Sequence, residues 1–321
     1  MIWTELNEII EKNHSFLISS HENQDGDSVG SQLAFYKYLK SLGKNARIYN
    51  KDKSLQKFIF FKDYDAISNI EPEQKFDVLV LLDCSNPQRC GIENIETRFA
   101  DKTVNIDHHG DNSMFATVNC VDVNAAATCK ILYDFLTENR ISYDCDIANY
   151  LLCGIITDTG GFHFNNADGE LYLIAHNLVK RGADNTLLFK KMFASNTIAA
   201  LSIRAKIWET LKFYADGKIS VISMPKSLIT DFGADSSATD GMSNAVLGGE
   251  GVEVGIFARY DENETQFSLR SAGKIDVCEI AASCGKGGGH KFAAGCTVKS
   301  GDWKCALENL ITKIEQKLIK V

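Results

Sequence analysis

The sequence predicts an α/β protein in which a doubly wound, mainly parallel sheet is followed by a smaller α+β domain, with the active site in the cleft between them. In the first half of the chain, apolar runs typical of buried strands alternate with helical patterns. After Gly217 the pattern changes to strand-like segments at 218–223, 253–260 and 265–271. A chain of 321 residues is also too long for one ordinary core.

We therefore predict a first domain at 1–190, a helical linker at 191–214 and a second domain at 215–321. Apolar runs predict strands of the first domain at 16–20, 44–49, 77–82 and 103–106. Helical spacing of apolar residues predicts helices at 28–42, 146–156 and 184–214 (broken near 195–196) and, in the second domain, at 276–283 and 303–318.

Side chains that bind metals follow three of the predicted strands. They are His21, Asp25 and Asp27 after the first strand, Asp83 after the strand 77–82, and Asp107, His108 and His109 after the strand 103–106. The carboxyl ends of parallel strands meet at one edge of a sheet, so these side chains are expected to converge there. Asp158, just after the helix 146–156, is a further candidate.

Each motif alone has a simpler explanation. Asp25-Gly26-Asp27 is typical of a turn that caps the next helix, and Asp158 of a turn before Gly160. Their joint occurrence favours a metal site, because carboxylates crowd together only with a compensating cation. Oxygen ligands with a few imidazoles suit two Mn²⁺ ions, with Mg²⁺ as a substitute. Two such ions would activate a hydroxide for attack on phosphorus.

A second group of candidates lies in the second domain. Gly287, Gly288 and Gly289 leave backbone N–H groups open to a phosphate, and His290 adds a donor. A flexible turn explains the same glycines. Arg270, in the segment Ser268-Leu269-Arg270-Ser271, could bind a phosphate with two hydrogen bonds, although a solvated arginine at a strand edge is the simpler explanation. Both segments together favour substrate binding.

Composition limits the partners. The net charge of −8 argues against long nucleic acid, which is bound through a basic surface. No run approaches the ~18 apolar residues of a membrane span, and the first residues lack the basic start of a signal peptide, so we expect no membrane partner and a cytoplasmic location. The ten cysteines contain no Cys-x-x-Cys pair, which favours reduced core residues over disulfides or a zinc site.

Taken together, these motifs resemble the DHH phosphoesterase superfamily. Asp107-His108-His109 occurs with the spacing His21-x-x-x-Asp25-x-Asp27, with Asp83 and with Asp158. Arg270, Gly287-Gly288-Gly289-His290 and Ala293-Ala294-Gly295 resemble its DHH-associated C-terminal domain. The resemblance covers nearly the whole chain, and the order of motifs is most similar to the oligoribonucleases called nanoRNase or pAp phosphatases. Two departures occur, since Gln24 replaces a frequent proline and Lys286 replaces one glycine of the run.

The resemblance implies roles for these residues. His21, Asp25 and Asp83 would hold one Mn²⁺, and Asp27, Asp83, His108 and Asp158 the other. His109 would face the scissile phosphate and Asp107 would orient the histidines, while Ser268, Arg270 and the glycine-histidine segment would bind substrate.

The expected function is hydrolysis of short oligoribonucleotides to mononucleotides and of pAp to AMP and phosphate. Alternatives are a cyclic-di-AMP or pApA phosphodiesterase, an inorganic pyrophosphatase or exopolyphosphatase, a RecJ-like exonuclease and a non-enzymatic nucleotide sensor. The resemblance also implies a possible homodimer.

Overall fold

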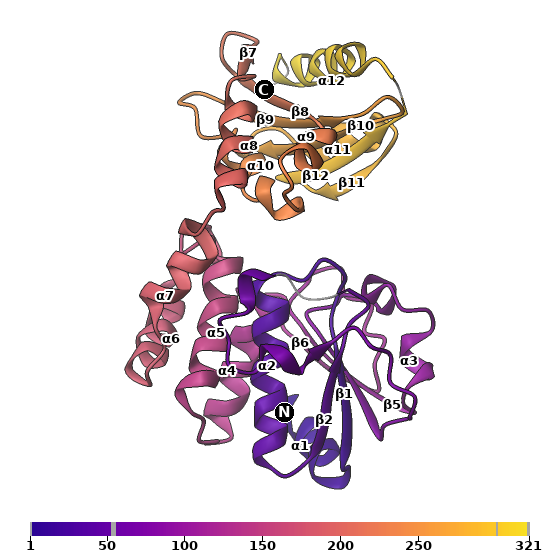
Figure 1. Ribbon diagram of the computed structural model, residues 1–321, viewed down its shortest axis with the longest axis vertical. Coiled ribbons are helices and arrows are strands. Elements are labelled where there is room, and N and C mark those ends of the chain that lie inside the picture. The colour runs from indigo at the N-terminus through magenta and orange to yellow at the C-terminus, as the bar shows by residue number, and fades with distance from the viewer. Residues whose placement is uncertain (1, 53–55, 300, 320–321) are drawn as a thin grey trace. The chain divides into compact units, whose positions relative to one another are not determined.

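The computed structural model describes residues 2–52, 56–299 and 301–319. The chain divides into two compact units, Met1–Ser195 and Asn196–Val321, each with its own hydrophobic core. Figure 1 shows the two units, each built around a sheet. Within the described residues, none of the helices combines the length and apolar character that a membrane crossing requires.

The first unit is built on a six-stranded sheet in which every pairing is parallel. In spatial order its strands are β3 (Ile67–Ser68), β2 (Asn45–Tyr49), β1 (Ser15–Ser19), β4 (Val78–Leu82), β5 (Lys102–Asp107) and β6 (Val118–Val121). All five residues of β4 are buried, as its continuous apolar run predicted. The parallel α/β fold predicted from the sequence is confirmed.

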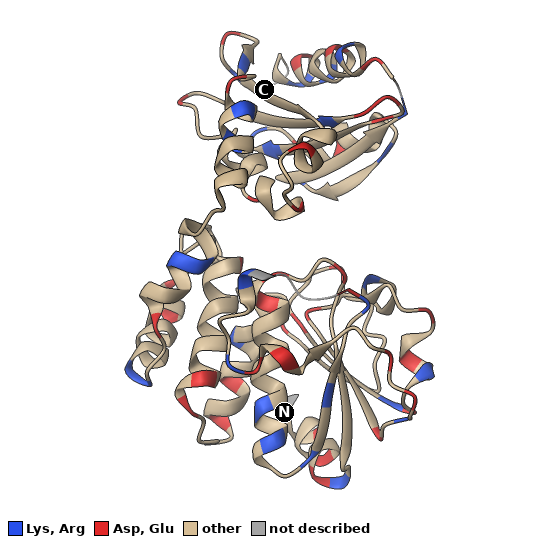
Figure 2. Ribbon diagram, viewed as in Figure 1, with Lys and Arg blue, Asp and Glu red and all other residues tan. Residues whose placement is uncertain are grey.

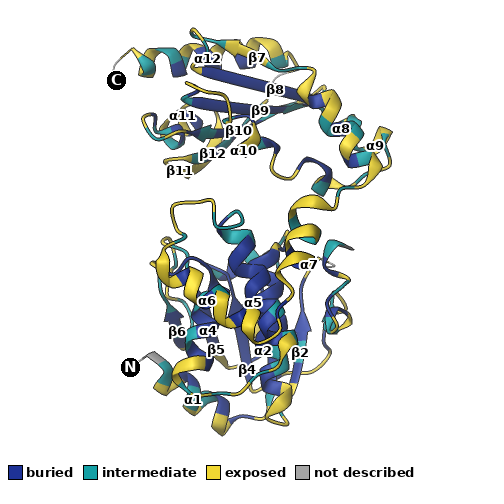
Figure 3. Ribbon diagram, turned by 90° about the vertical axis from the view of Figure 1, so that its left-hand side faces the viewer, coloured by how far each residue is buried: buried dark blue, intermediate teal, exposed yellow. Residues whose placement is uncertain are grey.

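Helices cover both faces of this sheet. The helices of the unit are α1 (Ile2–Lys12), α2 (Gly26–Ser41), α3 (Ile95–Arg98), α4 (Thr128–Glu138), α5 (Cys145–Asp158), α6 (Gly169–Lys180) and α7 (Asn185–Phe189), with 3-10 turns η1 (Gln56–Phe58), η2 (Tyr64–Ala66) and η3 (Pro87–Cys90) and a π-helical turn η4 (Lys190–Ala194). The helices α2, α4 and α5 form the larger core, whereas α3 and η3 cover the other face. In Figure 3, α5 is largely buried and α6 is more exposed.

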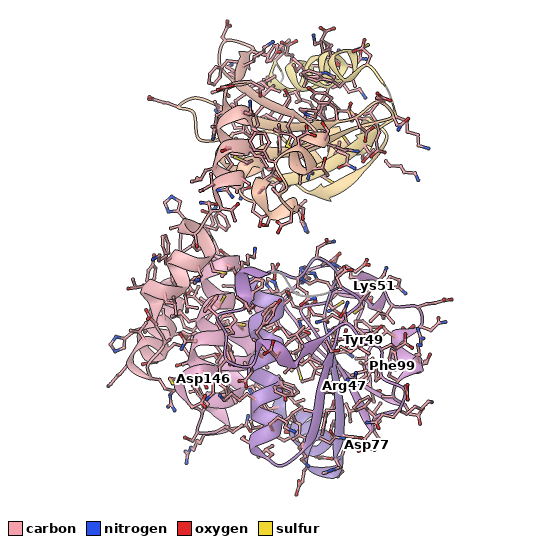
Figure 4. All side chains as sticks on the ribbon, in the orientation of Figure 1. Arg47, Tyr49, Lys51, Asp77, Phe99 and Asp146 are labelled. Carbon is pink, nitrogen blue, oxygen red and sulfur yellow. The ribbon has the colours of Figure 1, made fainter. Side chains whose placement is uncertain are left out.

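The strand order creates the place where a ligand is expected. The chain adds β2 and β3 on one side of β1, then crosses over to place β4, β5 and β6 on the other side. Open parallel sheets bind ligands beyond the carboxyl ends of the strands at such a reversal. In Figure 4, Asp77 lies at the amino end of the sheet and Lys51 at the opposite, carboxyl end. The carboxylate of Asp77 fixes the amino end by accepting hydrogen bonds from the N–H groups of His14 and Ser15.

Close packing of α2 against α5 brings two predicted ligands together. A Cβ at Gly30 would lie 2.3 Å from the carbonyl oxygen of Tyr150, and a Cβ at Gly154 would lie 2.5 Å from a carboxylate oxygen of Asp27. At Gly30 only glycine permits this approach without movement of the backbone, and at Gly154 a larger residue would displace the side chains of Cys129 and Asp27. As a result the first turn of α2 lies beside the end of α5, where Asp158 is the last residue.

The second unit is a mixed sheet with helices, which confirms the predicted α+β domain. Its strands in spatial order are β11 (Lys286–His290), β12 (Ala293–Val298), β10 (Thr265–Ser271), β9 (Val254–Tyr260), β8 (Ile219–Pro225) and β7 (Lys212–Tyr214), and only β8 and β9 pair in parallel. Its helices are α8 (Ile198–Trp208), α9 (Ser227–Asp231), α10 (Met242–Ala245), α11 (Val277–Ser283) and α12 (Trp303–Leu318), with the 3-10 turn η5 (Ser236–Thr239).

Two segments differ from the sequence expectation. The predicted helical linker 191–214 contains α8 and the strand β7, and Ile203 and Ile207 of α8 are buried in a hydrophobic cluster of the second unit. The glycine run, which a turn would explain, is an edge strand, because Gly287 pairs with Cys296 on β12. The sequence pattern does not predict either feature, because each depends on a tertiary neighbour. The helix α8 packs in the core of the second unit, and β11 pairs with β12.

Candidate metal centre

All the predicted metal ligands of the first unit converge at the carboxyl ends of β1, β4 and β5. Their ligand atoms form three groups in which every atom lies within 4.8 Å of the others. The groups are His21, Asp25 and Asp83; Asp27, His108 and Asp158; and Asp83, His108 and His109. The set therefore combines four aspartates with three histidines, donors that suit a hard divalent cation.

Asp83 lies at the centre of the cluster. Its Oδ2 lies 3.3 Å from Nε2 of His21, and its Oδ1 lies 3.6 Å from Nε2 of His108, so each oxygen faces a different group of ligands. The Thr128 hydroxyl donates to Oδ1 over 3.2 Å. Asp83 has a φ of +57°, a left-handed conformation that costs a non-glycine residue on the order of 1 kcal/mol. This conformation places the buried carboxylate of Asp83 at the carboxyl end of β4, beside the point where the strand order of the sheet reverses (the switch point).

Backbone carbonyls orient two of the histidines. His21 donates from Nδ1 to the carbonyl of Glu22 at 2.6 Å, and His108 donates from Nδ1 to the carbonyl of Ala125 at 3.2 Å. A proton on Nδ1 leaves the lone pair on Nε2, which is the nitrogen that faces the carboxylates in both residues. Both imidazoles are thus prepared to act as metal ligands.

Helix termini hold the remaining carboxylates. Asp25 is the N-cap of α2, where its Oδ1 accepts hydrogen bonds from two backbone N–H groups, while its Oδ2 lies 3.9 Å from Nε2 of His21. Asp27 is fully buried in the first turn of α2 and accepts hydrogen bonds from the N–H groups of Thr128 and Cys129 at the start of α4. Asp158, at the end of α5, reaches within 3.3 Å of Nε2 of His108.

A second hydrogen-bond network holds His109. Its Nδ1 donates to Oδ1 of Asp107 at 2.8 Å, and the side chain of Asn112 donates to the other oxygen of Asp107 at 2.6 Å. Asp107 is fully buried, whereas the His109 side chain is 24% exposed. The network fixes the ring of His109 through its Nδ1, and the side chain stays partly exposed.

The electrostatics of the cluster fit bound cations. Burial and the charge of Asp83 raise the pKa of Asp27 to about 7, and burial with the charges of Asp27, Asp25 and Asp83 raises the pKa of Asp158 well above its usual value. Burial lowers the pKa of His21, but the hydrogen bond and charge of Asp83 outweigh it and raise the value to about 9. Carboxylates that resist ionisation in such proximity ionise readily beside a divalent cation. The residues present therefore fit a metal centre.

Two supporting residues were not predicted from the sequence. Thr128 donates to both Asp27 and Asp83, and Asn112 holds Asp107. Asn112 follows the Asp-His-His motif closely, which is a weak signal, but Thr128 lies at the start of a helix with nothing in its neighbours to mark it. Their roles become visible only when α4 and the loop after β5 are placed in space.

The second unit brings two arginines into one polar pocket of about 250 Å³. The lining includes Arg259 on β9 and Arg270 on β10, with Asn244 accepting a 2.5 Å hydrogen bond from Nε of Arg270. Arg259 donates to the hydroxyl of Ser268, while its Nε is buried without a hydrogen-bond partner. Burial lowers the pKa of both guanidinium groups. Among the described lining residues these two guanidinium groups face a single carboxylate, that of Asp240, so positive charge is in excess and the pocket favours an anion.

The three glycines of β11 differ in what surrounds them. A Cβ at Gly287 would lie 2.3 Å from the carbonyl oxygen of Ala281, and Gly289 combines a φ of +138° with a similar clash. A Cβ at Gly288, in contrast, would meet nothing within 4 Å. Packing thus explains Gly287 and Gly289, while Gly288 and the exposed His290 leave an open stretch of strand.

Comparison with known proteins agrees with these features. The N-terminal domain of the DHH family matches residues 15–155, and the DHHA1 domain matches residues 217–320. A bifunctional oligoribonuclease and PAP phosphatase NrnA of Thermus thermophilus is 30% identical over 305 residues, which are 94% of this chain and 90% of the relative. A protein of the same name from Bacillus subtilis is 22% identical over 93% of this chain and 94% of its own.

Solved structures share the fold. An exopolyphosphatase-related protein from Bacteroides fragilis matches with a TM-score of 0.86 and 24% identity, covering 98% of this chain and 95% of the other. The exonuclease RecJ bound to manganese matches with a TM-score of 0.56 and 12% identity, covering 100% of this chain and 97% of the other. With both domain families present and a relative 30% identical over almost its whole length, the chain belongs to the DHH family of phosphoesterases.

Proposed function

We propose that this protein is a divalent-metal-dependent phosphoesterase that hydrolyses short oligoribonucleotides to mononucleotides and pAp to AMP and phosphate. The convergence of four aspartates and three histidines beyond the switch point of the sheet carries the proposal. The substrate class is supported by the relatives named as bifunctional oligoribonucleases and PAP phosphatases, which align over most of both chains.

The ligand groups suggest how two ions would be held. His21, Asp25 and Asp83 would bind one, and Asp27, Asp83, His108 and Asp158 the other, with Asp83 common to both. When bound, divalent ions supply positive charge that polarises a phosphoryl group and makes water acidic enough to attack at neutral pH. Four aspartates carry four negative charges when ionised, which two divalent cations would balance.

His109 is placed to act on the phosphate itself. Burial lowers the pKa of His109, but the hydrogen bond to Asp107 and the charge of Asp83 outweigh burial and raise the pKa. A protonated ring whose Nδ1 is held by Asp107 can donate from Nε2 to a phosphate oxygen. This donation would stabilise negative charge that increases in the transition state.

The second unit would favour short substrates. Its arginine pocket of about 250 Å³ matches a phosphate group rather than a strand of nucleic acid, and the chain as a whole carries a net charge of −8. In Figure 2, blue and red segments, which mark basic and acidic residues, are interspersed along the ribbon of both units. Binding would therefore depend on a terminal phosphate more than on a long backbone.

Replacing Arg270 by Ala is expected to raise KM for pAp by about 10- to 100-fold, because a charge-assisted hydrogen bond contributes about 1.5–3 kcal/mol. Steady-state kinetics measures the change. The exposed Lys274, which pairs with Glu253 in the same unit, supplies the control Lys274→Ala. Equal KM values for the two variants would remove Arg270 from the substrate site.

Replacing Gly288 by Ala is expected to leave the unfolding midpoint unchanged, since the added methyl meets no protein atom within 4 Å. It should nevertheless raise KM if a phosphate approaches this strand. Gly287→Ala is the matched control, and it should lower the unfolding midpoint because its Cβ would lie 2.3 Å from a carbonyl oxygen. An unchanged KM in Gly288→Ala would mean that substrate does not contact the strand.

A substrate panel tests the proposed function. The purified protein with Mn²⁺ is incubated in parallel with an RNA dinucleotide, pAp, cyclic-di-AMP, pyrophosphate and a 24-mer RNA. Rapid turnover of the dinucleotide and pAp with little cleavage of the 24-mer is expected. A preference for cyclic-di-AMP or pyrophosphate would contradict the proposed substrate while leaving a phosphoesterase, and equal activity in EDTA would contradict the metal dependence.

A further inference from the structure

The first unit contains a groove that is remote from the metal centre. It has a volume of about 710 Å³ and lies where α4 and α6 end. Its described lining contains no carboxylate, and six of its residues are Tyr133, Arg140, Tyr143, Asn177, Lys180 and Arg181. The metal centre lies at the start of α4, and an 11-residue helix separates its two ends by ~16 Å. The groove is therefore a separate site.

Arg140 occupies a position where glycine is normally found. It follows the C-cap Asn139 of α4 with a φ of +54°, and Ile141 donates its N–H to the carbonyl of Leu136, which closes the helix end. The same closure after α2 and α6 uses Gly43 and Gly182. A left-handed arginine is strained, whereas glycine is not. The basic side chain is thus present at a position where the backbone alone favours glycine.

The three basic side chains of the groove lack carboxylate partners. No ion pair within 4.0 Å involves Arg140, Lys180 or Arg181 among the described residues, whereas other basic residues of the unit are paired, such as Lys37 with Asp63 and Asp144. The C-terminal end of α6 is blue in Figure 2. The carbonyls at two helix ends attract cations, but they do not neutralise three full charges. An anionic ligand would neutralise these charges.

Tyrosine side chains supply the other half of the site. The guanidinium of Arg181 lies 4.2 Å from the centre of the Tyr143 ring and donates to the Tyr143 carbonyl. On the opposite helix, Tyr133 accepts a 2.9 Å hydrogen bond from the Asn177 side chain. These contacts hold the aromatic rings and the amide in place before a ligand arrives. A flat ring can stack on such a surface, as bases do on aromatic side chains and arginine.

We propose that this groove binds a nucleoside monophosphate. Arg140, Lys180 and Arg181 hold the phosphate, and the partly exposed ring of Tyr143 with the exposed Asn177 contacts the base, while the buried Tyr133 holds Asn177 in place. The volume lies within the range of small-molecule sites. Phosphate alone would use only the cations and a nucleoside only the rings, so the nucleotide binds more tightly than either part.

Calorimetry in EDTA with AMP, adenosine and inorganic phosphate tests the proposal. AMP is expected to bind at least tenfold more tightly than either fragment, and both Arg140→Gly and Lys180→Ala should weaken AMP binding at least tenfold. Arg140→Gly should also raise the unfolding midpoint, because glycine relieves the left-handed strain. Lys75→Ala, which removes an exposed lysine paired with Asp101, is the control and should bind AMP normally.

Photolabelling locates the bound nucleotide. With 8-azido-AMP, the label is expected on peptides covering 133–143 or 177–181, in the wild-type protein and equally in Arg270→Ala. Loss of the label in Lys180→Ala would support the groove. Labelling confined to other peptides, or AMP affinity unchanged in both Arg140→Gly and Lys180→Ala, would overturn the proposal. Neither result would bear on hydrolysis at the metal centre, so the two proposals fail independently.

Discussion

Asp83→Asn is expected to lower the rate of pAp hydrolysis on the order of 10³-fold or more, equivalent to about 4 kcal/mol of activation free energy. The amide keeps the size of the side chain but loses the charge and one acceptor oxygen. Because the two oxygens of Asp83 face different ligand groups, the change affects both proposed ion sites at once. Steady-state kinetics with Mn²⁺ in excess measures the loss.

The control for this variant is Asp101→Asn. Asp101 directly precedes β5, at the opposite edge of the same sheet, and its side chain is 92% exposed. The same chemical change there should leave activity unaltered. If Asp83→Asn retained more than about a tenth of wild-type activity, a central role for this carboxylate would be wrong.

His109→Ala is expected to lower kcat by about 10²- to 10³-fold while leaving the bound metal unchanged, because the ring would act on the phosphate rather than hold an ion. The neighbouring residue supplies the contrast. His108 faces both Asp83 and Asp158 with its Nε2, so His108→Ala should lose metal as well as activity. Metal analysis of the two purified variants, together with kcat, distinguishes the roles.

One result with these two variants would contradict the role given to His109. Loss of metal in His109→Ala would reassign its imidazole to an ion, which the grouping of His109 with Asp83 and His108 permits geometrically. Asn112→Ala offers an intermediate test, since it removes the hydrogen bond that holds Asp107, together with those that join Asn112 to Asn105 and to the N–H of Met114, and leaves the ligands themselves in place. A support of this kind typically changes activity by about 10- to 100-fold.

The convergence of the candidate ligands was predictable because most of them follow an element with a strong sequence signal. His21, Asp83 and Asp107 come at or after apolar runs that became β1, β4 and β5, and parallel pairing alone brings such positions together. Asp27 and Asp158 required more, namely the close contact of α2 with α5. The single motifs did not say which side chains would bind which ion, and that assignment came from the family resemblance.

Other features depend on tertiary neighbours and could not be predicted in the same way. The glycine run forms β11 only because β12 accepts it as an edge strand. Arg259 appears as an ordinary strand residue in the sequence, and its unpartnered Nε becomes evident only inside the pocket it shares with Arg270. Arg140 likewise becomes unusual only when its backbone conformation is known.

The number of divalent ions bound per chain tests the central claim most directly. Metal-free protein is titrated with Mn²⁺ and analysed for bound metal, alongside Asp83→Asn and Asp101→Asn. Two ions per chain in the wild type and in Asp101→Asn, with at most one in Asp83→Asn, is the predicted result. Two ions in Asp83→Asn, or a wild-type protein that hydrolyses pAp at full rate without any bound ion, would contradict the account.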